Sequence, residues 1–140
     1  TRPFLVSTAS AAAGLATILA LNITAGPLIA AIMACTIVNT LVMTLVTRRW
    51  KISIHAAATA SFVTMLLFVA LTAWPSHPDA SLLRPATVLS LAPLIPLMMW
   101  ARVRTGAHTW GQVVAGTLYG LFVPYAELTA LLQIGLFDSL

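Results

Sequence analysis

Residues 4–46 form one stretch of 43 positions without a single charged side chain. A helix needs about 20 mostly apolar residues to cross the hydrocarbon core of a bilayer, so this stretch is long enough for two crossings. The composition of residues 22–27, Asn-Ile-Thr-Ala-Gly-Pro, is typical of a turn followed by a helix start. We therefore expect two membrane-spanning helices, over about 4–21 and 27–46.

The rest of the chain has the same character, because 60% of the 140 residues are hydrophobic and only 7% are charged. About a quarter of the residues in a soluble domain are charged, so this chain cannot cover its surface with polar groups. Its apolar runs are continuous rather than alternating, which excludes a β-barrel. The sequence predicts an all-α, polytopic transmembrane helix bundle.

Three further spans follow, over about 53–74, 85–100 and 108–135, which makes five in this chain. Pro93 and Pro96 should kink the fourth span, because proline lacks the N–H that a helix needs. The last span carries glycines at a spacing typical of close helix packing in lipid: Gly111, Gly116 and Gly120.

The chain begins with Thr1 rather than methionine, and its first apolar run continues into a second span, unlike a signal peptide. We therefore expect a single domain over residues 1–140 that lacks an N-terminal portion, with six or more spans in the full protein.

Counting spans places six of the seven basic residues on one side of the membrane. This pattern has two interpretations that the sequence leaves open: the positive-inside rule, or a site for an anion. The basic residues lie in short loops, so membrane lipids are expected partners and nucleic acid is not. Only Arg84 falls on the other side, whereas the basic side holds Arg2, Arg48, Arg49, Lys51, Arg102 and Arg104.

Two histidines, His55 and His108, fall near helix starts on this basic side, whereas His77 falls in the opposite loop. A helix start presents unpaired N–H groups and the positive end of the helix dipole, which favour a bound phosphate. Ser53 is placed to cap the third span or to donate its hydroxyl to a phosphate oxygen. The pattern therefore predicts a phosphate pocket at one membrane surface.

Residues 101–116, ARVRTGAHTWGQVVAG, resemble the third signature of the type 2 phosphatidic acid phosphatase superfamily: S-R, five residues, H, three residues, D, and a nearby G. Arg102, His108 and Gly116 fall in register with it. Residues 51–55, KISIH, resemble the second signature, P-S-G-H, through Ser53 and His55. The opening T-R-P is similar to the end of the first signature, K, six residues, R-P, through Arg2.

This resemblance implies a phosphatase that acts on a lipid phosphate or an isoprenoid (di)phosphate at the membrane. His108 would be the nucleophile that forms a phosphohistidine, and His55 the general acid toward the leaving alkoxide. The non-bridging phosphate oxygens would be held by Arg102, Ser53, Arg2 and Lys51.

No cofactor is expected, and no metal. Magnesium sites use carboxylate ligands, and none of the three acidic residues is predicted on the basic side.

The sequence departs from the signatures at Ala101, Ile52 and Ile54, and most seriously at Gln112, which stands where the superfamily has aspartate. Glutamine can accept a hydrogen bond from the nucleophilic histidine and so orient it, but it supplies no charge. The alternative function is therefore a catalytically impaired family member that acts as a non-enzymatic membrane subunit. A homo-oligomer or a larger membrane complex is left open.

A small transporter or channel is the other alternative, and the absence of a charged residue at mid-span speaks against it. Glu127 lies 19 residues after His108, roughly 28 Å along a helix, which predicts a position near the opposite surface rather than in a proton relay. We expect an integral protein of a bacterial cell membrane, with an interfacial belt formed by Trp50, Trp74, Trp100 and Trp110.

Overall fold

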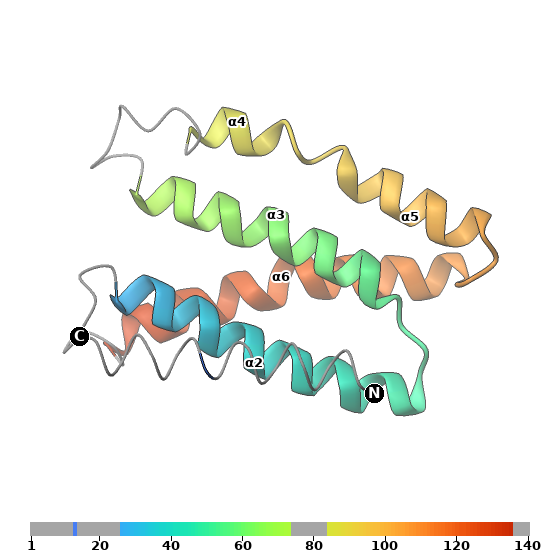
Figure 1. The fold of residues 1–140 in the computed structure, drawn as a ribbon, viewed down its shortest axis with the longest axis horizontal. Helices are drawn as coiled ribbons and strands as arrows, with labels where there is room; N and C mark the ends of the chain where they lie inside the picture. Colours follow the sequence, from blue (N-terminus) through green and yellow to red (C-terminus); the bar gives the residue numbers. More distant parts are fainter. Residues whose placement is uncertain (1–12, 14–25, 74–83, 136–140) are drawn as a thin grey trace. The chain divides into compact units, whose positions relative to one another are not determined.

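The computed structural model describes Ala13, residues 26–73 and residues 84–135. Within these residues every regular element is a helix, which confirms the all-α prediction (Figure 1). The first predicted span, over 4–21, lies outside the described residues apart from Ala13. The helices are α2 (Gly26–Arg49), α3 (Ile54–Ala73), α4 (Pro85–Leu89), α5 (Leu94–Arg104) and α6 (Trp110–Gln133).

Four segments of the described residues are long and apolar enough to cross a membrane, and they match the last four predicted spans. The chain is therefore an integral membrane protein with a helical architecture. The segments are Leu28–Arg49, Ile54–Thr72, Pro85–Arg104 and Trp110–Gln133.

Two helices end later than the sequence predicted. α2 continues through Arg49 and α5 through Arg104, although basic loops were expected from residues 47 and 102. Arginine is a good helix former, and its positive charge in a last turn interacts favourably with the helix dipole. The arginines therefore extend these helices instead of interrupting them.

The fourth span is broken into α4 and α5, which confirms the predicted kink. Between the two helices the backbone N–H groups bond three residues back rather than four, as from Leu91 to Val88 (3.0 Å) and from Leu94 to Leu91 (2.9 Å). Pro93 flanks α5 and Pro96 lies in its first turn, where a missing N–H costs no helical hydrogen bond.

The chain divides into two compact units, one made of residues 1–50 and 126–140 and the other of residues 51–125. A single domain over 1–140 stays a prediction.

In the first unit, α2 carries a series of threonines whose hydroxyls donate to the carbonyl four residues earlier. Thr36, Thr40 and Thr44 do so at 2.8, 2.7 and 2.7 Å, and Thr47 repeats the bond to Met43. A lipid environment offers these hydroxyls no water, so bonds within the helix are the local way to satisfy them.

The same unit shows the hydrogen-bond partners of Glu127. Its Oε2 atom accepts hydrogen bonds from Cys35 Sγ at 2.9 Å and from Asn39 Nδ2 at 2.5 Å, both on α2. Cys35 lies nine residues into α2, which is about 14 Å from the helix start. Glu127 thus bonds to α2 within the residues of two candidate spans, and its depth in the membrane stays a prediction.

In the second unit, α4 and α5 run alongside α3 (Figure 1). α6 approaches α3 through Gly116, where an added Cβ would lie 2.5 Å from the Ser53 carbonyl oxygen, and through Gly120, where it would lie 2.8 Å from Ala60 Cβ. The predicted packing role is confirmed for these two glycines. At Gly111 no atom of the described residues lies within 4 Å of an added Cβ, so the packing role of this glycine stays a prediction.

Candidate functional site

The start of α3 is capped by Ser53, as the sequence predicted. Its Oγ atom accepts the Ala56 N–H at 3.4 Å, and its side chain is 0% exposed. The Ser53 N–H in turn donates to the Gln112 carbonyl at 3.2 Å. This bond joins the start of α3 to the start of α6, so the two helices begin at the same end of the unit.

The start of α6 carries a reciprocal cap that the sequence interpretation missed. The Gln112 N–H donates to Thr109 Oγ1 at 3.4 Å, and the Thr109 N–H donates to Gln112 Oε1 at 3.1 Å. These are the two bonds of a capping box, whose signal, T-x-x-Q, is present at residues 109–112. The cap explains why α6 begins at Trp110 and leaves His108 just before the helix instead of in its first turn.

The turn between α5 and α6 explains the six-residue spacing of Arg102 and His108. Gly106 adopts a left-handed conformation with φ of 68° just after the end of α5, and its N–H donates to the Val103 carbonyl at 2.9 Å. The chain then reverses, and the His108 N–H donates to the Arg102 carbonyl at 3.3 Å. A main-chain hydrogen bond therefore ties the two residues together.

The His108 ring has two oxygen neighbours at one nitrogen. Nδ1 lies 3.2 Å from the Lys51 carbonyl oxygen and 3.2 Å from Gln112 Oε1. The Thr109 N–H can only donate, so it fixes the Gln112 amide with its oxygen toward His108. Both neighbours are then acceptors, and the network assigns the hydrogen to Nδ1 and a free lone pair to Nε2.

Arg102 lies in the last turn of α5 and is half-buried. Its Nε atom is buried, and within the described part of the chain it has no hydrogen-bond acceptor. A buried N–H without a partner is costly, and an oxygen of a bound anion would satisfy it. The structure thus leaves a cationic donor unsatisfied six residues before His108.

The remaining predicted site residues are less constrained. His55 lies in the first turn of α3 and is exposed, and its ring makes no hydrogen bond to any residue that the structure describes. The Lys51 side chain is exposed. The contact of its carbonyl oxygen with the His108 ring could not be predicted from the side chain. Arg2 lies outside the described residues. The structure therefore brings Arg102, Lys51, Ser53 and Gln112 together around His108, while their roles toward a phosphate stay predictions.

The sequence model of the PAP2 superfamily matches residues 31–133 of the chain. The chain belongs to the PAP2 superfamily. No curated protein and no solved structure gives a significant match. The PAP2 match confirms the resemblance seen in the sequence, and it includes the segments 51–55 and 101–116 that carry it. Membership in the PAP2 superfamily indicates a phosphatase that acts on a phosphoester.

Proposed function

We propose that this PAP2 member is a membrane-embedded phosphatase of a lipid phosphate or an isoprenoid (di)phosphate, and that it works through a phosphohistidine on His108. The observation that carries the proposal is the hydrogen-bonding state of this ring. Two acceptors hold Nδ1–H, so the Nε2 lone pair is available to attack phosphorus.

In the first step, His108 Nε2 forms a bond to phosphorus and the ester P–O bond breaks. The leaving oxygen, an alkoxide from a monophosphate or the oxygen of an isoprenoid monophosphate from a diphosphate, takes a proton, for which we assign His55 as the donor. Its exposed ring lies on the first turn of α3, at the end where α6 also begins. In the second step, His55 accepts a proton from water, the water oxygen attacks phosphorus, and the P–N bond breaks to release inorganic phosphate.

The negative charge of the phosphate needs cationic partners throughout both steps. Arg102 offers a buried Nε–H that lacks an acceptor among the described residues, and the Lys51 side chain is exposed three residues before the start of α3. The N-terminal ends of α3 and α6 add the positive ends of two helix dipoles. Ser53 is fully buried, so we assign it mainly to holding the start of α3 in place.

Two tryptophans support a lipid as the substrate. Trp100 lies two residues before Arg102 and Trp110 two residues after His108, and each is 56% exposed. Exposed tryptophans in membrane proteins concentrate at the level of the lipid headgroups. A site at that depth meets the phosphate of a lipid whose tail stays in the bilayer.

The test is phosphate release from the purified, detergent-solubilised protein in the presence of EDTA. The substrate panel contains a diacylglycerol phosphate, an isoprenyl monophosphate and an isoprenyl diphosphate. We expect wild-type activity on at least one of them and a loss of about 10³-fold or more in His108→Ala, because the nucleophile is removed.

The matched control is His77→Ala, the same substitution at a histidine that the sequence assigns to the opposite loop. It should keep wild-type activity. A folded wild-type protein that releases no phosphate from any member of the panel would instead support the non-enzymatic subunit, and an active His108→Ala would refute the assigned nucleophile.

A further inference from the structure

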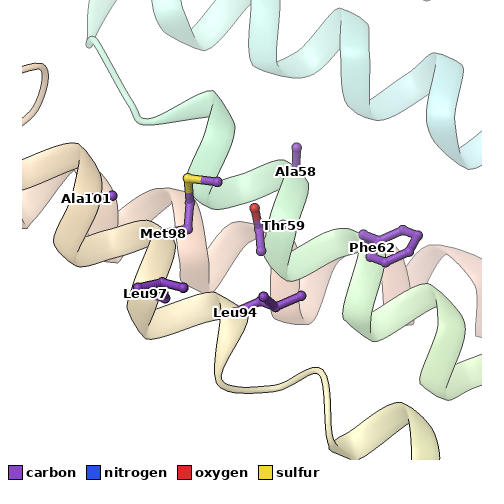
Figure 2. A pocket seen from close by; sticks show the side chains of 7 residues that line it. All are labelled: Ala58, Thr59, Phe62, Leu94, Leu97, Met98 and Ala101. Carbon is purple, nitrogen blue, oxygen red and sulfur yellow. The ribbon is translucent and has the colours of Figure 1, made fainter.

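A groove of about 440 Å³ lies between α3 and α5, within the second unit (Figure 2). Thr59 is its one polar lining residue, and its hydroxyl donates to the His55 carbonyl at 2.9 Å, so it has a partner inside its own helix. The groove is therefore a hydrocarbon surface in chemical terms. Its lining consists of Ala58, Thr59, Phe62, Leu94, Leu97, Met98 and Ala101.

One end of the groove adjoins the candidate site. Ala101 directly precedes Arg102, and Thr59 lies one helical turn after His55. Residues three and four apart share a helix face, so Ala58 and Thr59 continue the face of α3 that begins at His55. The groove therefore starts beside two residues to which we assign phosphate chemistry.

The other end of the groove lies at Phe62, opposite Ala101 in Figure 2. From His55 to Phe62 is seven residues, which is about 10 Å along α3. Phe62 is 54% exposed and Leu97 is 58% exposed, so the groove is open along the flank that a lipid would meet. Small side chains, Ala58 and Ala101, leave room near the site, and the bulky ones lie further along.

We propose that this groove seats the hydrocarbon tail of the same lipid phosphate whose head reaches His108 and Arg102. This inference rests on the proposed function for the head group. Lipid tails are as apolar as the groove, so burial there supplies little net affinity. The groove acts by alignment, because a tail held along α3 and α5 points the phosphate toward the site and limits its orientations.

Photo-crosslinking tests whether the groove binds the lipid tail, without requiring turnover. The probe is a diacylglycerol phosphate with a diazirine within the first few carbons of one tail, and a phosphatidylcholine with the same tail is the control. We expect the phosphate probe to label 58–62 and 94–101 and to be displaced by unlabelled lipid phosphate. Equal labelling by the phosphatidylcholine, or labelling elsewhere, would overturn the proposal.

A substitution series tests the same point through activity. Ala58→Trp fills the groove, so the ratio of long-chain to short-chain, water-soluble phosphate hydrolysis should fall about tenfold. Ala130→Trp, the same change at an exposed alanine that does not line the groove, should leave this ratio unchanged. An unchanged ratio in Ala58→Trp would overturn the tail seat. A wild-type protein that is inert but specifically crosslinked would refute the phosphatase and keep the seat.

Discussion

α6 carries two polar clusters whose hydrogen bonds have different functions. At its start, a neutral amide, Gln112, caps the helix and faces the His108 ring. Seventeen residues after Trp110, a carboxylate, Glu127, accepts two hydrogen bonds from α2. Glu127 is the only acidic side chain in the residues that the structure describes. The described acid thus bonds to a neighbouring helix, while the side chain beside the proposed nucleophile, His108, is a neutral amide.

The aspartate that the superfamily has at position 112 would both orient the imidazole and stabilise its positive charge, and in this chain these two functions are separated. Orienting an imidazole needs only an acceptor at Nδ1, and Gln112 and the Lys51 carbonyl both supply one. Stabilising the positive charge that develops on the ring needs a negative partner, which neither supplies. Glu127 is the acidic residue that the structure describes, but its described hydrogen bonds are made to Cys35 and Asn39. Among the described residues, His108, which we propose as the nucleophile, therefore has acceptors that orient its ring but no acidic side chain at its Nδ1 atom.

The largest effect in this comparison is expected for Gln112→Ala, which removes the amide from the cluster at the start of α6. This variant loses the side-chain acceptor at Nδ1–H and keeps the Lys51 carbonyl as the one described acceptor, so the ring is held less firmly. We expect phosphate release to fall about 10²-fold, which is less than the cost of about 10⁴-fold for a wrong tautomer in a triad enzyme.

Thr109→Ala is the control for the loss of helix capping in Gln112→Ala. This variant removes the Thr109 hydroxyl from the capping box but keeps the Thr109 N–H that fixes the Gln112 amide. It should destabilise the protein by about 1 kcal/mol with only a small change in activity per folded molecule. Equal losses of activity in both variants would mean that Gln112 acts on helix stability alone.

A smaller effect, in the opposite direction, is expected when charge is restored. Gln112→Glu keeps the side-chain length and can still complete the capping box, so it should raise turnover by about tenfold, or roughly 1.4 kcal/mol of charge stabilisation. Gln112→Asp should raise turnover less, because its side chain is one methylene shorter and gives up the bond from Thr109. Turnover that stays at the wild-type level in both variants would show that another group already supplies the charge.

The smallest effect is expected at the other cluster. Glu127→Ala leaves Asn39 Nδ2 and Cys35 Sγ without their shared acceptor, so thermal unfolding in detergent should show a loss of about 1 kcal/mol. Glu127→Gln, which keeps an acceptor oxygen, should lose less. Turnover per folded molecule should stay unchanged in both, and a large loss of turnover would connect Glu127 to the chemistry.

The helical spans could be predicted because lipid imposes a simple requirement on length and apolarity. The last four predicted spans match the structure, and Pro93 correctly marked the break in the fourth. Helix ends were less predictable, because arginines such as Arg49 and Arg104 fit a last turn as well as a loop. The hydrogen-bond partners of Glu127 could not be read from its place on α6, since they lie 88 and 92 residues away in the chain.

The site was predictable wherever a short motif carries its own geometry. Ser53 caps α3 as its position suggested, and the spacing of Arg102 and His108 follows from a local turn. The capping role of Gln112 has a sequence signal, T-x-x-Q at residues 109–112, beside its place in the phosphatase signature. The contact of the Lys51 carbonyl with His108 has no sequence signal, because every residue carries the same main-chain oxygen and only the fold selects which one is used.

That main-chain contact makes one part of the site resistant to mutation. Changing the side chain at position 51 removes an ammonium group but leaves the oxygen that faces the His108 ring. A substitution at position 51 is therefore expected to change the affinity for an anion without changing the orientation of the imidazole. A neutral residue introduced there would report on electrostatic attraction alone.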